Sequence, residues 1–555
     1  MTSVGRRLRQ LLALLGAGAG ASAPGCAAAP HPGGALPNGT VIREPVVRVG
    51  QFAWVEAIAI APARAFIVAS GGVGVYDRNA RRWLAPIALG VGGSRSIGYR
   101  EPCAAVTNLI GDAVWIACGR RVTVVRPAIS AVWATDLGEP VAALAASRGG
   151  ADAWVFFTGT VAVVSATGTA RPLSPGETVP VDRIQARTVV GASQMARMIN
   201  DPLLTRDDAL RVWPPTAIAH GEGAGESWVG TSGGGVFLAD LDFHRSRQLP
   251  YGLRSGAVRS IVRTATGVII AEDPAGAGQD RSLVTTASDD LSSWEWPSLY
   301  TGLGAVNAVA AREGMLCIAG ELGAGIANLS PLANSASATL ANDHRVFEPS
   351  RVAIATRQGC IVGTDRGPVV MPWLSRDAEV GAEPRALGPT PPVRALASSG
   401  DTVWIGTLGG LFRAVGPGPV ELVRLSPSVP RNVVALALTD DGIAVGSAGE
   451  VWLLSGAGRV EQAVRPVAAV GRVGRLTSLA FGEGTLWIGG SNGALAIGLP
   501  SGGSIDVPLD EPSAVTLPTA GGHEVRSIAL APAVAWIGTA AGIVRVRRDN
   551  GGLPR

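Results

Sequence analysis

The chain has 555 residues, of which 47% are hydrophobic and 16% are charged, and its formal net charge is only +4. No dense basic block occurs, which argues against a dedicated nucleic-acid-binding protein. The 75 glycines follow no Gly-X-Y period, so they indicate many tight turns and favour an all-β fold over a helical one.

The first 25 residues are typical of a signal peptide. Three arginines precede the short apolar run Leu11–Gly20, which is too short to span a bilayer. Cys26 follows a glycine just beyond this run and resembles the cysteine of a bacterial lipobox, which implies lipidation at Cys26. Ordinary cleavage after Ala29 is the alternative. Residues 26–45 are then expected to form a flexible tether.

One motif recurs from the beginning of the mature chain to its end. Its clearest copies are WVGTSGGGVF at Trp228, WIGTLGGLFR at Trp404, WIGGSNGALA at Trp487 and WIGTAAGIVR at Trp536. Eleven copies start at positions 67, 115, 154, 228, 269, 317, 361, 404, 444, 487 and 536. Apart from one gap of 74 residues they are 39 to 49 residues apart, and a period of about 40 to 45 residues is that of a four-stranded propeller blade.

Each repeat divides into four short predicted strands. In the repeat that begins at Val393, the runs VRALAS, VWIGT, LFRAV and VELVRL are separated by Gly, Asp and Pro clusters. The small-residue turns suit hairpins, in which positive φ favours glycine. One blade cannot bury both of its faces, so a closed ring of blades is expected.

The pattern W-I-G-T-x-x-G-[LI], placed after a V-x-[SA]-[LI] strand, resembles the two-component regulator propeller repeat. The copies at Trp404 and Trp536 match it well, and the resemblance covers about residues 50 to 549. It implies a propeller of the ligand-binding sensor type. The best-known members precede a membrane helix and a histidine kinase, but this sequence ends at Arg555 without either, so kinase activity is not expected.

Eleven or twelve blades exceed the four to eight of one propeller, so two stacked propellers are predicted. The predicted domains are residues 46–300, with an insertion at 170–215, and residues 301–555. Six and six blades is the simplest division, with five plus seven, or one large ring, as alternatives. Within the insertion, the segment Asp182–Pro215 has helical spacing at Ile184, Val190, Met195 and Met198. It is either a lid or docking element, or a surface insertion without a role.

The remaining cysteines are interpreted by their places in the repeats. Cys103 and Cys118 lie on adjacent predicted strands, and a disulfide is predicted between them in an oxidising envelope. Cys317 and Cys360 occupy nearly equivalent places in neighbouring repeats and are interpreted as small buried apolar residues. No pair has CxxC spacing, so no structural zinc is expected.

No motif in the sequence predicts catalysis. Two G-x-S-x-G matches, around Ser232 and Ser491, lie in the repeat turn, whereas a nucleophile elbow needs a strand–turn–helix context. The five histidines show no metal-binding spacing, and no catalytic, cofactor or metal residue is predicted. Six periodic tryptophans are expected in the core between blades: Trp115, Trp154, Trp228, Trp404, Trp487 and Trp536. Four off-register tryptophans are candidates for a surface patch: Trp213, Trp294, Trp296 and Trp373.

The function predicted from these features is non-enzymatic ligand binding or protein docking in the bacterial cell envelope. The partner would be an envelope protein or a glycan, without a cofactor or nucleic acid, and membrane attachment would depend on the lipid anchor alone. The expected location is the periplasm or, as a lipoprotein, the outer membrane; otherwise the protein is secreted. The alternatives are an envelope-assembly scaffold lipoprotein and a glycan-active hydrolase or lyase, which would need two carboxylates about 5 to 10 Å apart.

Overall fold

The computed structural model describes most of the sequence beyond residue 45. The described residues are 46–89, 101–129, 131–147, 149–179, 184–221, 226–274, 283–297, 302–329, 346–373, 383–416, 420–423, 431–440, 442–455, 460–464, 473–499, 514–517 and 524–548. The predicted signal peptide, tether and lipidation site at Cys26 lie outside them. Among the described residues, no helix is long and apolar enough to cross a membrane.

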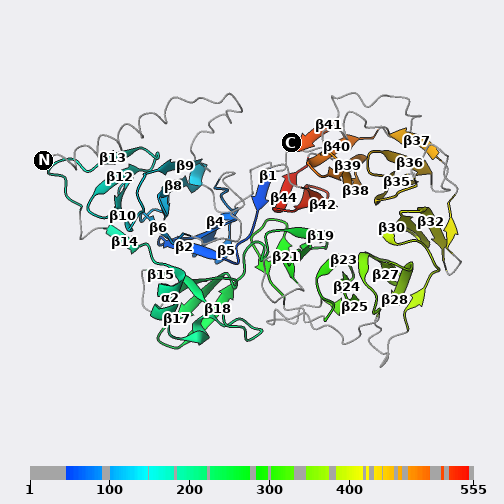
Figure 1. Ribbon diagram of the computed structural model, residues 1–555, viewed down its shortest axis with the longest axis horizontal. Helices are drawn as coiled ribbons and strands as arrows, with labels where there is room; N and C mark the ends of the chain where they lie inside the picture. The colour runs from blue at the N-terminus through cyan, green and yellow to red at the C-terminus, as the bar shows by residue number, and fades with distance from the viewer. Residues whose placement is uncertain are drawn as a thin grey trace. The chain divides into compact units, whose positions relative to one another are not determined.

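The described strands form eleven sheets, nine of them with four antiparallel strands (Figure 1). Neighbouring strands are consecutive in sequence in all but two places, as expected for propeller blades. The predicted all-β propeller fold of four-stranded blades is therefore confirmed.

The chain divides into two compact units, and the first unit comprises residues Phe52–Tyr251 of the described chain. Its four sheets are β2 (Val55–Ile60), β3 (Arg64–Ala69), β4 (Gly72–Asp77) and β5 (Arg82–Trp83); β6 (Cys103–Thr107), β7 (Val114–Cys118), β8 (Arg121–Arg126) and β9 (Ala131–Asp136); β10 (Ala143–Ser147), β11 (Asp152–Phe156), β12 (Val161–Ser165), β13 (Ala170–Pro172) and β14 (Ile184–Thr188); and β15 (Pro215–His220), β16 (Glu226–Thr231), β17 (Val236–Asp240) and β18 (Arg245–Leu249). The unit also contains η1 (Pro127–Ile129), α2 (Ala192–Met198) and η3 (Pro202–Thr205). The innermost strands β15, β2 and β6 pack in that order, and β6 also contacts β10 and β14.

The second unit comprises Gly252–Arg555 and the segment Arg43–Gln51. Its first four sheets are β19 (Val258–Arg263), β20 (Gly267–Glu272), β21 (Val284–Ser288) and β22 (Trp294–Glu295); β23 (Val306–Arg312), β24 (Met315–Gly320) and β25 (Gly323–Asn328); β26 (Ser350–Ala355), β27 (Gly359–Thr364), β28 (Pro368–Pro372) and β29 (Arg385–Ala386); and β30 (Val393–Ser399), β31 (Thr402–Thr407), β32 (Gly410–Val415) and β33 (Glu421–Leu422). The other three are β34 (Ala435–Leu438), β35 (Gly442–Gly446), β36 (Val451–Ser455) and β37 (Val460–Val464); β38 (Leu476–Gly482), β39 (Thr485–Gly490), β40 (Gly493–Gly498) and β41 (Ala514–Leu517); and β42 (Val525–Ala531), β43 (Val534–Thr539) and β44 (Gly542–Arg547) with β1 (Val46–Val49).

Seven sheets of the second unit form a ring. Their innermost strands pack in the order β19, β23, β26, β30, β34, β38 and β42, and β42 packs against β19 again (Figure 1). The strand β1 pairs with β44 and supplies the outermost strand of the last sheet.

The predicted domain boundary near residue 300 is therefore wrong. The units divide between Tyr251 and Gly252, because the sheet that begins at β19 packs within the second unit against both β23 and β42. The described sheets number four and seven, so the division into six and six is also wrong. The stacking of two propellers stays a prediction.

In four copies of the motif a threonine side chain bonds across the turn, and these are Thr231, Thr364, Thr407 and Thr539. Thr407 Oγ1 donates to the Gly410 carbonyl at 2.9 Å and accepts from the Gly409 N–H at 3.0 Å. Gly410 has a φ of 140°, which only glycine adopts readily. Thr539 makes the same bond to the Gly542 carbonyl at 2.9 Å. The glycines of WIGTLGG therefore build a hairpin turn.

The periodic tryptophans lie in the core, as predicted. Trp115, Trp228, Trp487 and Trp536 are essentially inaccessible to solvent, and Trp404 packs with residues of β30 and of the next sheet. The prediction that the off-register tryptophans form a surface patch is wrong for Trp294 and Trp296, because both are buried. Their indole N–H groups bond backbone carbonyls at 2.9 Å, which lets such large side chains be buried without an orphaned donor.

Candidate functional site

Eight innermost strands carry a β-bulge directly after their first residue. The register of each strand skips one position, and a bulge redirects the side chain of the extra residue. The bulge residues are Glu56, Thr216, Arg259, Asn307, Arg351, Arg394, Thr477 and Arg526. Most occupy the variable position of V-x-[SA]-[LI]. The signal was present, because arginine fills this position in four of the seven repeats of the second unit.

In the second unit these side chains join neighbouring sheets through one acidic residue. Asp273 accepts from Arg526 Nη1 at 2.9 Å and from Arg259 Nη2 at 3.3 Å. Arg259 Nη1 then donates to Asn307 Oδ1 at 2.6 Å, and Asn307 donates to the Ser350 carbonyl at 2.9 Å. These hydrogen bonds hold Arg259 and Arg526 in place, so these two arginines are less available for a ligand.

The other two arginines of this set are more open. Arg351 pairs with Asp365 at 3.1 Å, and both side chains are nearly half exposed. Arg394 is exposed and forms no hydrogen bond or ion pair with another described residue. This part of the second unit therefore offers positive charge at its surface.

A pocket of about 360 Å³ lies within the first unit, between the sheets β2–β5 and β15–β18. One rim is the turn between β4 and β5. Asp77 Oδ1 accepts the N–H groups of Asn79 and Ala80 at 3.0 and 2.9 Å, and Arg81 has the left-handed φ of 52°. This turn brings Arg78 and Arg81 to the pocket.

One carboxylate lies in the pocket lining and is already bound. Glu226 Oε1 is 3.0 Å from Arg78 Nη2 and accepts the indole N–H of Trp228 at 2.7 Å. Arg78 Nη1 donates to the carbonyls of Ala61 and Pro62 at 3.1 and 2.8 Å. Arg78 and Glu226 are therefore held in place by these bonds, and their opposite charges cancel.

Two further arginines leave the pocket with excess positive charge. Arg81 and Arg247 are exposed and form no ion pair with a carboxylate of the described chain. Burial raises the pKa of the Tyr76 phenol above 10.0, and the charges of Arg247 and Arg81 oppose that rise. Tyr76 is therefore a neutral hydroxyl at physiological pH, and its ring packs edge to face on Trp228 with centroids 5.4 Å apart.

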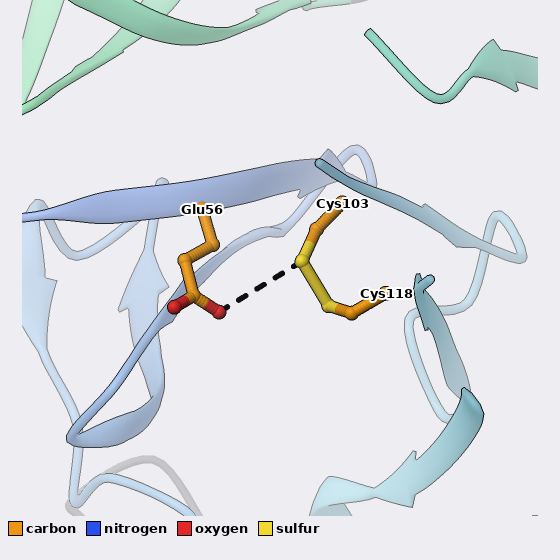
Figure 2. A group of neighbouring side chains, drawn as sticks. All are labelled: Glu56, Cys103 and Cys118. Atoms are coloured by element: carbon orange, nitrogen blue, oxygen red, sulfur yellow. Dashed lines mark hydrogen bonds between the residues drawn. A yellow bond between two sulfur atoms is a disulfide. The ribbon is translucent and has the colours of Figure 1, made fainter. Parts of the chain in front are cut away.

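The predicted disulfide between Cys103 and Cys118 is present, with the Cα atoms 4.3 Å apart (Figure 2). The interpretation of Cys317 and Cys360 as unlinked apolar residues is corrected. Both are fully buried, but a disulfide joins them between the neighbouring sheets of β24 and β27. Their separation of one repeat was the signal that placed them on adjacent sheets.

The segment Asp182–Pro215 is helical only in part. Ile184 lies in β14, which pairs with β10 on the inner edge of its sheet, and only Ala192–Met198 forms a helix. Met195 is buried and Met198 is exposed. The segment packs against the sheet of β15–β18, where Leu204 of η3 joins the core of that sheet. A role as a lid or docking element stays a prediction.

The turn that contains Ser232 is covered by this segment. The indole of Trp213 lies on Gly233 and Gly234, where even a Cβ would collide with it. Its N–H donates to Asp207 Oδ2 at 3.0 Å. Trp213 is thus a packing residue, and the G-x-S-x-G match lies in a strand–turn–strand context without a helix after the serine.

No family model and no curated protein matches this chain. Solved structures that resemble it include the computationally designed protein Ika8, with 17% identity and a TM-score of 0.38 over 60% of this chain and 95% of that one. Another is the extracellular domain assigned to a hybrid two-component system of B. thetaiotaomicron, with 12% identity and a TM-score of 0.39 over 88% and 69%. A third is the WD40 β-propeller domain of Doa1, with 15% identity and a TM-score of 0.39 over 54% and 95%. The specific repeat family stays a prediction.

Proposed function

We propose that this protein is a non-enzymatic binding protein that takes a small anionic ligand in the pocket of its first unit. The observation that carries the proposal is the pocket itself. Its volume of about 360 Å³ is within the range of small-molecule sites, and aromatic and charged side chains line it together.

The net positive charge of the pocket lining indicates an anionic ligand. Three guanidinium groups face one carboxylate, and that carboxylate is held by Arg78. Arg81 and Arg247 have no carboxylate partner among the described residues, although Arg247 also contacts the Tyr76 hydroxyl, and both would bind a carboxylate or phosphate group, which arginine recognises through paired N–H donors. The apolar body of the ligand would lie against Pro62 and Leu238, which are the more accessible apolar residues of the lining.

The same lining supports binding over catalysis. A glycan-active site needs two carboxylates, one of them free to move a proton. Glu226 is the carboxylate of this pocket lining, and it accepts hydrogen bonds from Arg78 and Trp228. The described lining of this pocket therefore offers no second carboxylate that could act as a general acid or base.

The test is calorimetric titration of the full chain with a panel of mono- and dicarboxylates and phosphate monoesters. We expect at least one compound to bind, and Arg81→Gln and Arg247→Gln each to weaken it roughly tenfold, as the loss of one charge-assisted hydrogen bond predicts. Arg121→Gln is the matched control, since Arg121 is exposed on β8 of another sheet. No binding by any compound, or equal losses in the control, would overturn the proposal.

The envelope location is part of the proposal and depends on the N-terminal residues. Incorporation of labelled palmitate that disappears in Cys26→Ala would support a lipoprotein, and secretion without a label would support plain export. Docking of an envelope protein, including a role as an assembly scaffold, is the alternative function. It predicts a stable partner in envelope fractions whose binding is indifferent to Arg247→Gln.

A further inference from the structure

The cysteines Cys103 and Cys118 belong to a hairpin that is already fully paired. They lie directly opposite each other on β6 and β7, and four further residue pairs continue the same register. The disulfide therefore adds no new connection between segments of the fold. Both sulfur atoms are at the end of the hairpin, and Cys118 remains partly accessible to solvent.

A carboxylate from the neighbouring sheet completes the group. Glu56 is the bulge residue of β2, between Val55 and Ala57, and its Oε2 lies 3.9 Å from Cys103 Sγ (Figure 2). One ligand atom from each of Glu56, Cys103 and Cys118 lies within 4.8 Å of the others. A disulfide sulfur carries no proton, so only the reduced thiol of Cys103 can donate to this carboxylate.

We propose that Cys103, Cys118 and Glu56 form a redox-gated site for a thiophilic divalent cation such as Zn²⁺. Two thiolates and one carboxylate are ligands that zinc accepts in tetrahedral sites, with water in the fourth position. Zinc–ligand bonds of about 2.0 to 2.3 Å put neighbouring ligand atoms roughly 3.5 Å apart. The three ligand atoms already lie within 4.8 Å of one another, so only a small approach separates them from such a site.

The gate is a balanced thiol–disulfide exchange. A dithiol reductant gives two electrons and two protons to the Cys103–Cys118 disulfide, whose S–S bond breaks, and the reductant becomes a disulfide itself. Zn²⁺ then displaces the two thiol protons, while Glu56 binds as a carboxylate. The oxidised site is closed to metal because its sulfur atoms are bonded to each other.

The experiment uses the full chain with Cys26→Ser, so that no fifth thiol contributes. Zn²⁺ is titrated against a chromogenic chelator with and without a phosphine reductant. We expect one Zn²⁺ per chain in reductant and none without it. Cys118→Ser should abolish that binding, and Glu56→Gln should weaken it at least about tenfold, the loss that even an outer-shell partner causes.

The second cysteine pair provides the matched control. Cys317 and Cys360 are fully buried, and the described chain places no carboxylate or histidine with them in a group of three potential ligands. The double variant Cys317→Ser/Cys360→Ser should keep the zinc stoichiometry. If that variant does not fold, alkylation of the parent chain with Cys26→Ser tests the same site. In reductant, Zn²⁺ should protect Cys103 and Cys118 of that chain from alkylation. Unprotected cysteines, or zinc binding that survives Cys118→Ser, would overturn the site.

Discussion

Glu272 occupies the position that threonine holds in three of the four clearest repeats. It pairs with Val258, as Thr407 pairs with Val393 and Thr539 with Val525. Its side chain is fully buried and accepts from the N–H and hydroxyl of Ser255 at 2.7 and 3.0 Å. Burial raises the pKa of the Glu272 carboxyl above 4.5, and these hydrogen bonds and the Arg254 charge oppose the rise only in part. The folded protein therefore holds a proton here that the unfolded chain releases.

This residue should make stability depend on pH. Between pH 4.5 and the raised pKa, the folded state binds more protons than the unfolded state, so the free energy of unfolding falls as pH rises. The fall is at most about 1.4 kcal/mol per pH unit in that window. Glu272→Gln should remove it, and urea unfolding from pH 4 to 8 measures the slope. An unchanged slope in the variant would show that Glu272 is ionised in the fold.

The glycine before the motif threonine explains how one blade packs on the next. A Cβ at Gly406 would approach Val433 Cγ1 to 2.6 Å, and one at Gly538 would approach Val258 Cγ1 to 2.5 Å. Val258 begins β19, the innermost strand of the following sheet in the ring. The glycine of W-I-G-T and the valine of V-x-[SA]-[LI] are therefore complementary halves of one contact between sheets.

Gly538→Ala should weaken the contact that closes the ring. Its methyl group would overlap Val258, and overpacking of a tight core costs about 1 to 3 kcal/mol. Gly498→Ala is the control, because a Cβ at Gly498 meets nothing within 4 Å. Urea unfolding of both variants measures the difference. Equal stabilities would contradict the packing role.

The second unit is discontinuous in sequence. Its last sheet takes β1 as its fourth strand, and the whole of Phe52–Tyr251 lies between β1 and the rest of that unit. Val47 and Val49 of β1 are buried, while Arg48 between them faces outward. Closure of the ring therefore joins the two sequence ends of the second unit through backbone hydrogen bonds, which opposes separation of its first and last sheets.

The double substitution Val47→Asp/Val49→Asp should selectively destabilise the second unit. Two carboxylates would replace buried apolar groups, which costs several kcal/mol, on the order of 3 or more. Limited proteolysis should then cut within 252–548 while fragments of 52–251 survive. Arg48→Gln is the control on the outward face of the same strand. Cleavage of both units at equal rates would show that β1 does not lock the second unit alone.

The sequence by itself determined the strands, the turns and the blade period, because these depend on local alternation and on glycine and threonine at fixed offsets. It also placed the periodic tryptophans in the core and paired Cys103 with Cys118, which are neighbours on one hairpin. Only the tertiary structure decided which sheets share a ring, since β1 and β44 are joined by pairing across almost the whole chain. The pocket brings Arg78 and Arg247 together from different sheets, and Glu56 reaches Cys103 from another sheet. Such contacts depend on how blades pack, and the repeat pattern is the same whichever blades become neighbours.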